Sequence, residues 1–169
     1  IRSLLALNPN YDTEFLKSAY RKAEQLHENQ LRRSGEPYII HPVAVAKILA
    51  ELGLDDRTLA AGLLHDAIED TDYSLADLEE EFGPQVALLV DGVTKLGSLV
   101  YESREDRQAE NIRKMFLAMS KDIRVLIIKL ADRRHNLETM AQVRPEKRKR
   151  IARETLEIYV PIATRLGLS

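Results

Sequence analysis

Apolar residues recur at helical spacing along this chain, and no stretch sustains the period-two alternation of a half-buried strand. The first apolar stripe consists of Leu16, Ala19, Tyr20, Ala23 and Leu26. A later and more strongly apolar segment reads IRVLIIKLADRRHNLETM and turns polar at Asp132. The pattern predicts an all-α fold, a helical bundle of about seven to eight or more helices.

Proline, glycine and acidic residues indicate where the helices begin and end. Pro42 suits the first position of a helix, and Gly53 suits its exit. Asp55 or Asp56 can cap the next helix, which is expected to run unbroken through LAAGLLHDAIED. These signals give two consecutive helices joined by a short turn.

Similar signals continue along the rest of the chain. Ser74 and Asp77 have the spacing of a capping box for a short helix that ends at Gly83. A loop is expected in SLVYESREDRQAEN, before a further helix. Pro145 begins the last long helix, and a kink is expected near Pro161.

Length and composition limit the class of protein. The 169 residues suit one domain, and the net charge of −2 makes the chain no general ligand of nucleic acid. Cysteine is absent, which excludes disulfides and thiolate metal sites. No apolar run approaches the roughly 20 residues of a membrane-spanning helix. We expect a cytoplasmic protein, and the first residue, Ile1, suggests a fragment or a processed product.

The stretch GLLHDAIEDTD places one histidine among several carboxylates. On a helix, His65 and Glu69 are four residues apart, as are Asp66 and Asp70, so the two pairs lie on adjacent strips of one side. His65 and Asp66 can share a metal ion. Glu69 and Asp70 would then lie one turn further, beside substrate or water.

Further metal ligands would have to come from other parts of the chain. His41 precedes a proline at the expected start of a helix, and Asp132 marks the point where an apolar helix becomes polar. Together with His65 and Asp66, they make a set of two imidazoles and two carboxylates. Such a mixed nitrogen and oxygen set suits Mn²⁺, Fe²⁺, Mg²⁺ or Zn²⁺. The alternative is that the acidic run is a solvated helix end and His41 a capping or core histidine.

Five segments resemble one family over nearly the whole chain: SGEPYIIHPVAVAKILAEL, LLHDAIEDTD, FGPQVALLVDGVTKL, MFLAMSKDIRVLIIKLADRRHNLETM and RETLEIYVPIATRLG. They resemble the HD phosphohydrolase superfamily and, more narrowly, the hydrolase domain of long RelA/SpoT-type alarmone enzymes. The resemblance implies an HD-domain helical bundle that uses Mn²⁺ to remove pyrophosphate from the 3′ position of ppGpp or pppGpp. The products would be GDP or GTP, and this hydrolysis would end the stringent response.

The resemblance also implies roles for individual residues. The metal ligands would be His41, His65, Asp66 and Asp132, and the pair that activates water would be Glu69 and Asp70. The implied substrate-binding residues are Arg32, Arg33, Ser34, Tyr38, Asn136, Thr139 and Lys149. Arg33 stands where lysine is usual, Arg134 where leucine is usual and Glu138 where arginine is frequent. The last two departures affect local charge rather than the chemistry.

The final segment, YVPIATRLGLS, looks like the junction before the synthetase domain of the long enzymes. Residues 1–169 are therefore expected to be the hydrolase domain, with the synthetase domain as a partner in cis. Direct binding of nucleic acid or membrane is not expected. Two alternatives stay open: an HD-type phosphohydrolase of another nucleotide, and a regulatory HD domain without catalysis.

Overall fold

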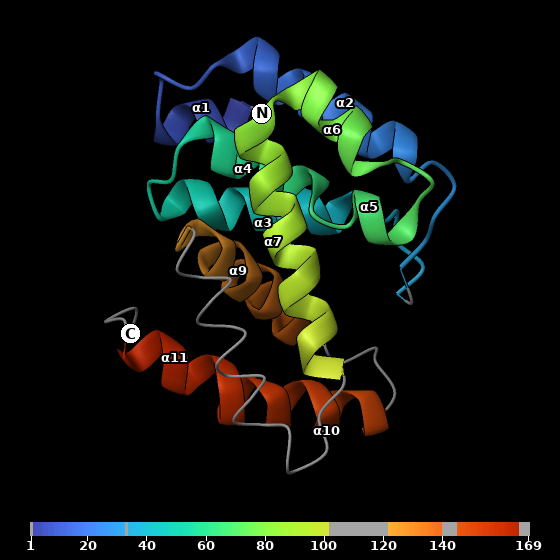
Figure 1. Cartoon of the computed structure of the whole chain (residues 1–169), viewed down its shortest axis with the longest axis vertical. Helices are drawn as coiled ribbons and strands as arrows, with labels where there is room; N and C mark the ends of the chain where they lie inside the picture. The colour runs from blue at the N-terminus through green and yellow to red at the C-terminus, as the bar shows by residue number, and fades with distance from the viewer. Residues whose placement is uncertain (1, 33, 102–121, 140–144, 166–169) are drawn as a thin grey trace.

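The computed structural model describes residues 2–32, 34–101, 122–139 and 145–165, and helices account for most of them (Figure 1). Within these ranges the only strand pairing is an isolated bridge between Leu31 and Pro37. The helices are α1 (Arg2–Leu7), α2 (Thr13–Leu26), α3 (Ile40–Glu51), α4 (Asp56–Leu64), α5 (Ala67–Asp70), α6 (Leu75–Phe82), α7 (Pro84–Tyr101), α9 (Arg124–Glu138), α10 (Pro145–Glu154), η3 (Thr155–Tyr159) and α11 (Val160–Arg165). The all-α prediction is confirmed.

Helix α4 is the centre of the bundle. It packs against α2, α3, α7 and α9, and every residue from Thr58 to Leu64 is buried. In Figure 1, α7 crosses in front of α3 and α4, with α9 beside it. Helices α1, α2 and α6 lie at one end of the molecule, and α10 and α11 lie at the other. The residues that follow α4 therefore emerge in the middle of the fold.

Several predicted helix boundaries are confirmed. Ser74 and Asp77 form a reciprocal capping box at the start of α6. The helix ends at Gly83, whose φ of 88° lies in the left-handed region that favours glycine. Asp55 is the N-cap residue of α4, although its carboxylate accepts hydrogen bonds from Thr58 and Arg124 rather than from a backbone N–H.

Two boundaries in the first half differ from the prediction. Helix α3 begins at Ile40, so Pro42 occupies its third position rather than its first. Proline is tolerated there because the first four N–H groups of a helix lack intrahelical partners. The helix expected through LAAGLLHDAIED is broken: α4 ends at Leu64, and residues 65–66 form a turn before α5.

Differences also occur near the ends of the described segments. Helix α7 continues to Tyr101, whereas a loop was expected from Ser98. The rest of that expected loop, and the helix expected to follow it, lie outside the described residues. The short helix α1 was not predicted. None of the described helices is both long and apolar enough to cross a membrane.

The C-terminal helical segment changes its winding just before Pro161. Residues Thr155–Tyr159 form a π-helical turn between α10 and α11. Proline has no N–H to donate and its ring crowds the preceding turn, which explains a local change of winding at this point. Arg133 of α9 contacts this segment, with Nη2 3.0 Å from Oε2 of Glu154 and the guanidinium 4.9 Å from the ring centroid of Tyr159.

Candidate functional site

The turn after α4 places His65 in the interior of the bundle. Its Nδ1 lies 2.8 Å from the carbonyl oxygen of Gly62, and the side chain is only 1% exposed. Close packing fixes this position, because a Cβ at Gly62 would lie 2.6 Å from a side-chain carbon of Leu49 on α3. Since Nδ1 donates to the carbonyl, Nε2 carries the lone pair and faces the site.

His41 enters the same site from the first turn of α3. Its Nε2 lies 3.1 Å from Oδ1 of Asp132 on α9. Its Nδ1 lies 2.7 Å from Nδ1 of His135, also on α9. Because both rings are buried, this contact fixes the orientation of the His41 imidazole.

The two histidines and two carboxylates converge on one point. Ligand atoms of His41, His65 and Asp132 all lie within 4.8 Å of one another. Oδ2 of Asp66 lies 3.1 Å from Nε2 of His65 and 3.8 Å from Nε2 of His41. The structure thus brings together all four residues that the sequence suggested as metal ligands.

The donor atoms of this cluster fit a divalent cation. Nε2 of His65 is buried and makes no hydrogen bond within the described residues, although Oδ2 of Asp66 lies 3.1 Å away. Two imidazole lone pairs and two carboxylates facing one another would be costly to bury without a positive charge between them. Nitrogen and oxygen ligands without sulfur suit a first-row dication.

The electrostatics of the cluster agree with this interpretation. Burial favours the neutral ring of His65, yet the carboxylates of Asp66 and Asp132 raise its pKa well above the ordinary value. Burial also favours protonation of Asp132, but Lys129, His41 and His65 hold the pKa of that carboxyl well below its usual range. The cluster therefore attracts positive charge, which a bound cation would supply in place of a proton.

Tyr38 connects the cluster to one of the predicted catalytic acids. Its hydroxyl lies 2.6 Å from Oδ2 of Asp66 and 3.1 Å from Oδ2 of Asp70. The ring stacks on His27, with centroids 4.5 Å apart. His27, the C-cap residue of α2, is only 4% exposed because its ring packs against Tyr38.

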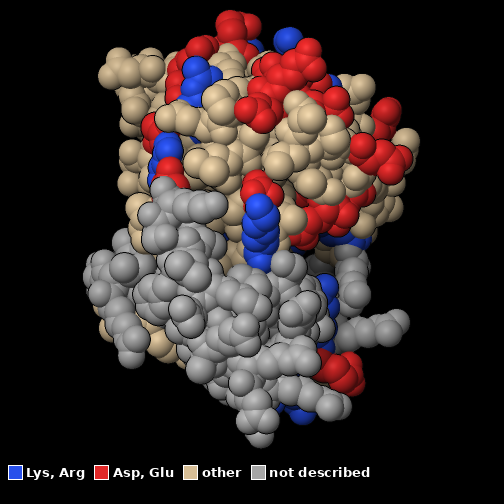
Figure 2. All heavy atoms as spheres, viewed as in Figure 1, with Lys and Arg blue, Asp and Glu red and all other residues tan. Residues whose placement is uncertain are grey.

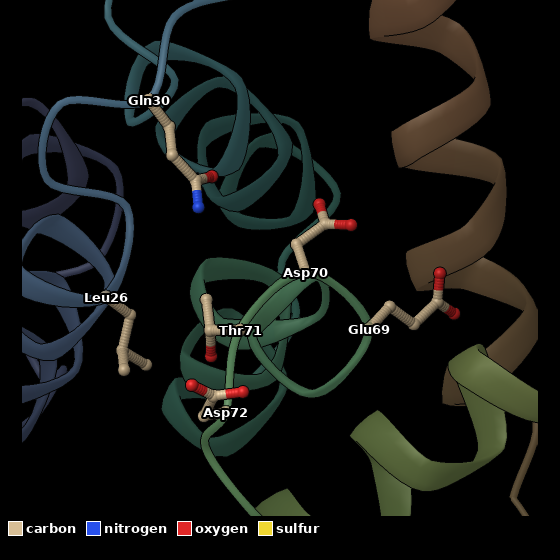
Figure 3. A pocket seen from close by; sticks show the side chains of 6 residues that line it. All are labelled: Leu26, Gln30, Glu69, Asp70, Thr71 and Asp72. Carbon is tan, nitrogen blue, oxygen red and sulfur yellow. The ribbon is translucent and has the colours of Figure 1, made fainter.

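Glu69 and Asp70, on α5, point in different directions (Figure 3). Both residues line a pocket of about 460 Å³, together with Leu26, Gln30, Thr71 and Asp72. Figure 3 shows the Glu69 carboxylate turned toward α9, away from Leu26 and Gln30. Partial burial raises the pKa of Glu69, against the opposing charge of Lys129.

The residues expected to bind substrate are only partly brought together. Nη2 of Arg32 donates to Oγ1 of Thr139 at 3.2 Å, which joins the loop before α3 to the end of α9. Ser34 is in the same loop and donates to Glu36 at 3.1 Å. Asn136 donates to Oδ1 of Asp132 at 2.7 Å, so it contacts a candidate ligand directly.

For the other two predicted substrate-binding residues, the described part of the chain shows no contact with this group. Arg33 lies outside the described residues. Lys149 is exposed on α10, and in the ranges that the structure covers its side chain has no contact with the cluster. Arg134 and Glu138, two of the residues that depart from the family pattern, form an exposed ion pair with each other at 2.9 Å, so their own charges offset each other.

The sequence analysis missed Lys129. Its Nζ lies 3.0 Å from Oδ2 of Asp132, one turn away on α9. A signal was present in the sequence: a single lysine three residues before Asp132, inside an otherwise apolar run. His135 also belongs to the group of residues around the cluster, since its Nδ1 contacts Nδ1 of His41, a candidate ligand.

Taken together, these helices and side chains define an all-α domain with a buried cluster of histidines and carboxylates that could hold a metal ion. A family model described as "HD domain" matches residues 19–169. The chain therefore belongs to the HD domain family.

Named relatives show which members of the HD domain family this chain is similar to. The chain is 60% identical over 155 residues to guanosine-3′,5′-bis(diphosphate) 3′-pyrophosphohydrolase of Vibrio cholerae, covering 92% of this chain and 22% of that protein. It is 58% identical to the bifunctional (p)ppGpp synthase/hydrolase SpoT of Escherichia coli, covering 95% of this chain and 23% of that protein. A GTP pyrophosphokinase of Streptomyces coelicolor is 54% identical over 100% of this chain and 20% of its own length. The chain thus spans about a fifth of the length of these relatives.

A solved structure is also similar. It belongs to a metazoan ortholog of SpoT that hydrolyses ppGpp, with a TM-score of 0.63 and 30% sequence identity. The match covers 83% of this chain and 80% of that one, so it extends over most of both proteins.

Proposed function

We propose that this chain is a metal-dependent 3′-pyrophosphohydrolase of ppGpp and pppGpp, with GDP or GTP and pyrophosphate as products. The observation that carries the proposal is the convergence of His41, His65, Asp66 and Asp132 around Nε2 of His65, a buried nitrogen that makes no hydrogen bond within the part of the chain that the structure describes. The hydrolase names of several relatives and the ppGpp hydrolysis by the metazoan neighbour support the choice of substrate.

The same four residues would hold the metal ion, for which we propose Mn²⁺. When bound there, a dication would polarise a phosphate group and lower the pKa of water. The acidic composition makes such a charge necessary, because the substrate is a polyanion and eight acidic residues lie between His65 and Glu81 without a lysine or arginine. The acidic end of the molecule over α6 is visible in Figure 2.

Glu69 and Asp70 are the groups proposed to manage protons. Glu69 takes a proton from a water molecule, and the oxygen of that water attacks the phosphorus bonded to the 3′ oxygen. The bond between that phosphorus and the 3′ oxygen breaks, and the 3′ oxygen receives either the proton that Glu69 took from water or one from solvent. Tyr38 orients Asp70 through the hydrogen bond to its carboxylate. An elevated pKa at Glu69 suits a base that works near neutral pH.

Nucleotide binding is proposed for the loop before α3 and the end of α9. Arg32 and Thr139 are already in contact, which supports a joint role. Ser34 and Tyr38 lie between Arg32 and α3 along the chain, and Asn136 lies three residues before Thr139 at the end of α9. Arg33 adjoins Arg32 in the sequence. Lys149 is the weakest member of this set, because it is exposed on a different helix. We further infer cytoplasmic action and, from the relatives' names, a synthetase region in cis.

The test is direct. The purified chain is incubated with ppGpp, with Mn²⁺ or with a chelator, and the products are identified. The proposal expects GDP and pyrophosphate in the presence of Mn²⁺ and no turnover with the chelator. Comparable hydrolysis of dGTP, or release of single phosphate from the 3′ end, would favour an HD-type hydrolase of another nucleotide. Metal binding without turnover would favour a regulatory domain, as the synthetase name of one relative suggests.

A further inference from the structure

Lys129 is a basic residue on the buried side of the helix that carries a candidate metal ligand. Its side chain is 15% exposed, and its Nζ lies 3.0 Å from Oδ2 of Asp132, which is itself 8% exposed. An exposed lysine and carboxylate one turn apart contribute little, but a buried pair must offset the cost of removing both charges from water. The position of this ammonium therefore needs a reason beyond the local helix.

The contacts of Asp132 divide its two oxygens between different partners. Oδ2 faces Lys129. Oδ1 accepts from Asn136 at 2.7 Å and lies 3.1 Å from Nε2 of His41. Lys129 therefore holds the oxygen that points away from the histidines, and the other oxygen remains directed into the cluster.

The ammonium also lies close to Glu69. A Cβ at Gly97 of α7 would lie 3.5 Å from Nζ of Lys129 and 3.6 Å from Oε1 of Glu69, so both groups border the same point. Figure 3 shows the Glu69 carboxylate directed toward α9, the helix that bears Lys129. Lys129 is thus a neighbour of two carboxylates with different proposed tasks.

The carboxylates around the candidate metal site carry more negative charge than one dication can neutralise. The centre contains the carboxylates of Asp66, Glu69, Asp70 and Asp132. A bound dication would offset only half of their charge when all four are ionised, and an anionic phosphate would still be repelled. A fixed ammonium beside Asp132 reduces the remaining negative charge, and it opposes the dication through the same Coulomb interaction.

We propose that Lys129 is a positioning residue that holds Oδ2 of Asp132 and lets this acidic centre accept phosphate, at the expense of affinity for the metal. This inference rests on the proposed metal centre but not on the identity of the nucleotide. It predicts effects of opposite sign on the two ligands. A lysine that served only to stabilise the fold would, when removed, weaken the binding of both.

The test compares wild type with Lys129→Met, which keeps a long apolar stem without the charge, and with Lys129→Gln, which keeps a donor for Oδ2. Calorimetry measures Mn²⁺ binding to the metal-free protein, and then the binding of inorganic phosphate to the Mn²⁺-saturated protein. A blank titration of phosphate into Mn²⁺ without protein corrects for the heat of their direct interaction in buffer. Thermal unfolding of each variant establishes whether it is folded. If Lys129→Met does not fold, the comparison is made with Lys129→Gln alone.

Both variants lose the positive charge of Lys129, which repels Mn²⁺ and attracts phosphate. They are therefore expected to bind Mn²⁺ at least about threefold more tightly than wild type and phosphate at least about threefold less tightly. Mn²⁺ binding that is unchanged or weaker in the folded variants would overturn the inference. Phosphate binding equal to that of wild type would overturn it as well.

Lys17→Met is the matched control. Lys17 forms an ion pair of the same i,i+3 spacing with Glu14, at 2.7 Å, but on the exposed surface of α2. It should change neither affinity. Absence of ppGpp turnover in wild type that binds Mn²⁺ and phosphate would contradict the proposed substrate and leave the Lys129 comparison intact. Absence of saturable Mn²⁺ binding in wild type would contradict the metal centre, and the inference about Lys129 with it.

Discussion

His41 and His65 present the same ring nitrogen to the site and use the other for support. Nδ1 of His65 lies 2.8 Å from the Gly62 carbonyl, and Nδ1 of His41 lies 2.7 Å from His135. In both rings Nε2 is the atom that faces Asp132. Supporting contacts of this kind fix the tautomer and the ring orientation, so the candidate ligands are held before any cation binds.

Glu69 provides a prediction about pH at the scale of one residue. Burial, together with the charges of Asp66 and Asp70, raises its pKa above the ordinary value of 4.5, although Lys129 opposes this. A base must be deprotonated, so turnover should fall as the pH drops through a pKa higher than that of an ordinary glutamate. The measurement is kcat against pH.

Glu69→Gln is the companion variant. It should lose turnover by about 10²-fold or more, in line with the usual contribution of a general base. The pH profile of its residual activity should lack the fall at low pH that results from protonation of Glu69. An unchanged rate with an unchanged pH profile would mean that Glu69 takes no proton.

Tyr38 provides a second prediction at this scale. Tyr38→Phe keeps the ring that stacks on His27 but removes the hydroxyl shared by Asp66 and Asp70. Hydrogen bonds to charged groups contribute about 1.5–3 kcal/mol, so the free energy of unfolding should fall by about that amount. Turnover should fall as well, because Asp70 loses its orienting partner.

Tyr11→Phe is the control for that variant. The Tyr11 hydroxyl donates to the carbonyl of Leu54 at 2.8 Å, in another part of the fold. Urea denaturation should show a loss of stability in both variants, whereas ppGpp turnover should be retained in Tyr11→Phe. Full turnover in Tyr38→Phe would contradict the orienting role.

Among the elements, the junction of α3 and α4 decides the position of the site. Gly62 has no room for a side chain, because an added Cβ would lie 2.6 Å from Leu49. Gly62→Ala should therefore separate the two helices slightly and destabilise the protein by about 1–3 kcal/mol, as overpacking of a core typically does. Since His65 follows α4 directly, Mn²⁺ affinity should fall too.

Gly97→Ala on α7 is the matched substitution. Its added Cβ would meet Lys129 and Glu69 at ordinary contact distances of 3.5 and 3.6 Å, so no overpacking is expected there. Thermal unfolding and Mn²⁺ titration distinguish the two variants. A Gly62→Ala protein as stable as wild type would show that the helices can adjust without cost.

For the whole molecule, the four candidate ligands join elements that are distant along the chain. They come from α3, from the turn after α4 and from α9. A cation that binds only the folded state adds stability by mass action, about 2.7 kcal/mol at a free concentration of 100 times Kd. Mn²⁺ should therefore raise the temperature of unfolding in proportion to the logarithm of its concentration.

Asp132→Ala should abolish most of that stabilisation, together with turnover, because it removes one anionic ligand. Glu138→Ala is the control on the same helix, since Glu138 is exposed and pairs only with Arg134 among the described contacts. The readout is thermal unfolding with increasing Mn²⁺. An undiminished shift in Asp132→Ala would contradict its assignment as a ligand.

The sequence by itself determined the helical class, the capping box at Ser74 and the candidate ligands, because periodicity and short motifs act locally along the chain. It did not determine which histidines meet. His41 and Asp132 are 91 residues apart in sequence, and only the packing of α3 against α9 brings them to 3.1 Å.

Tertiary structure alone also decided the break in the helix after Leu64, the burial of His27 and the pairing of Lys129 with Asp132. Residues 65 and 66 contain no proline or glycine to mark the end of a helix. A local pattern carries no information about partners that lie on another helix. Pairing and burial depend on distances across the core, and these are fixed only when the helices pack.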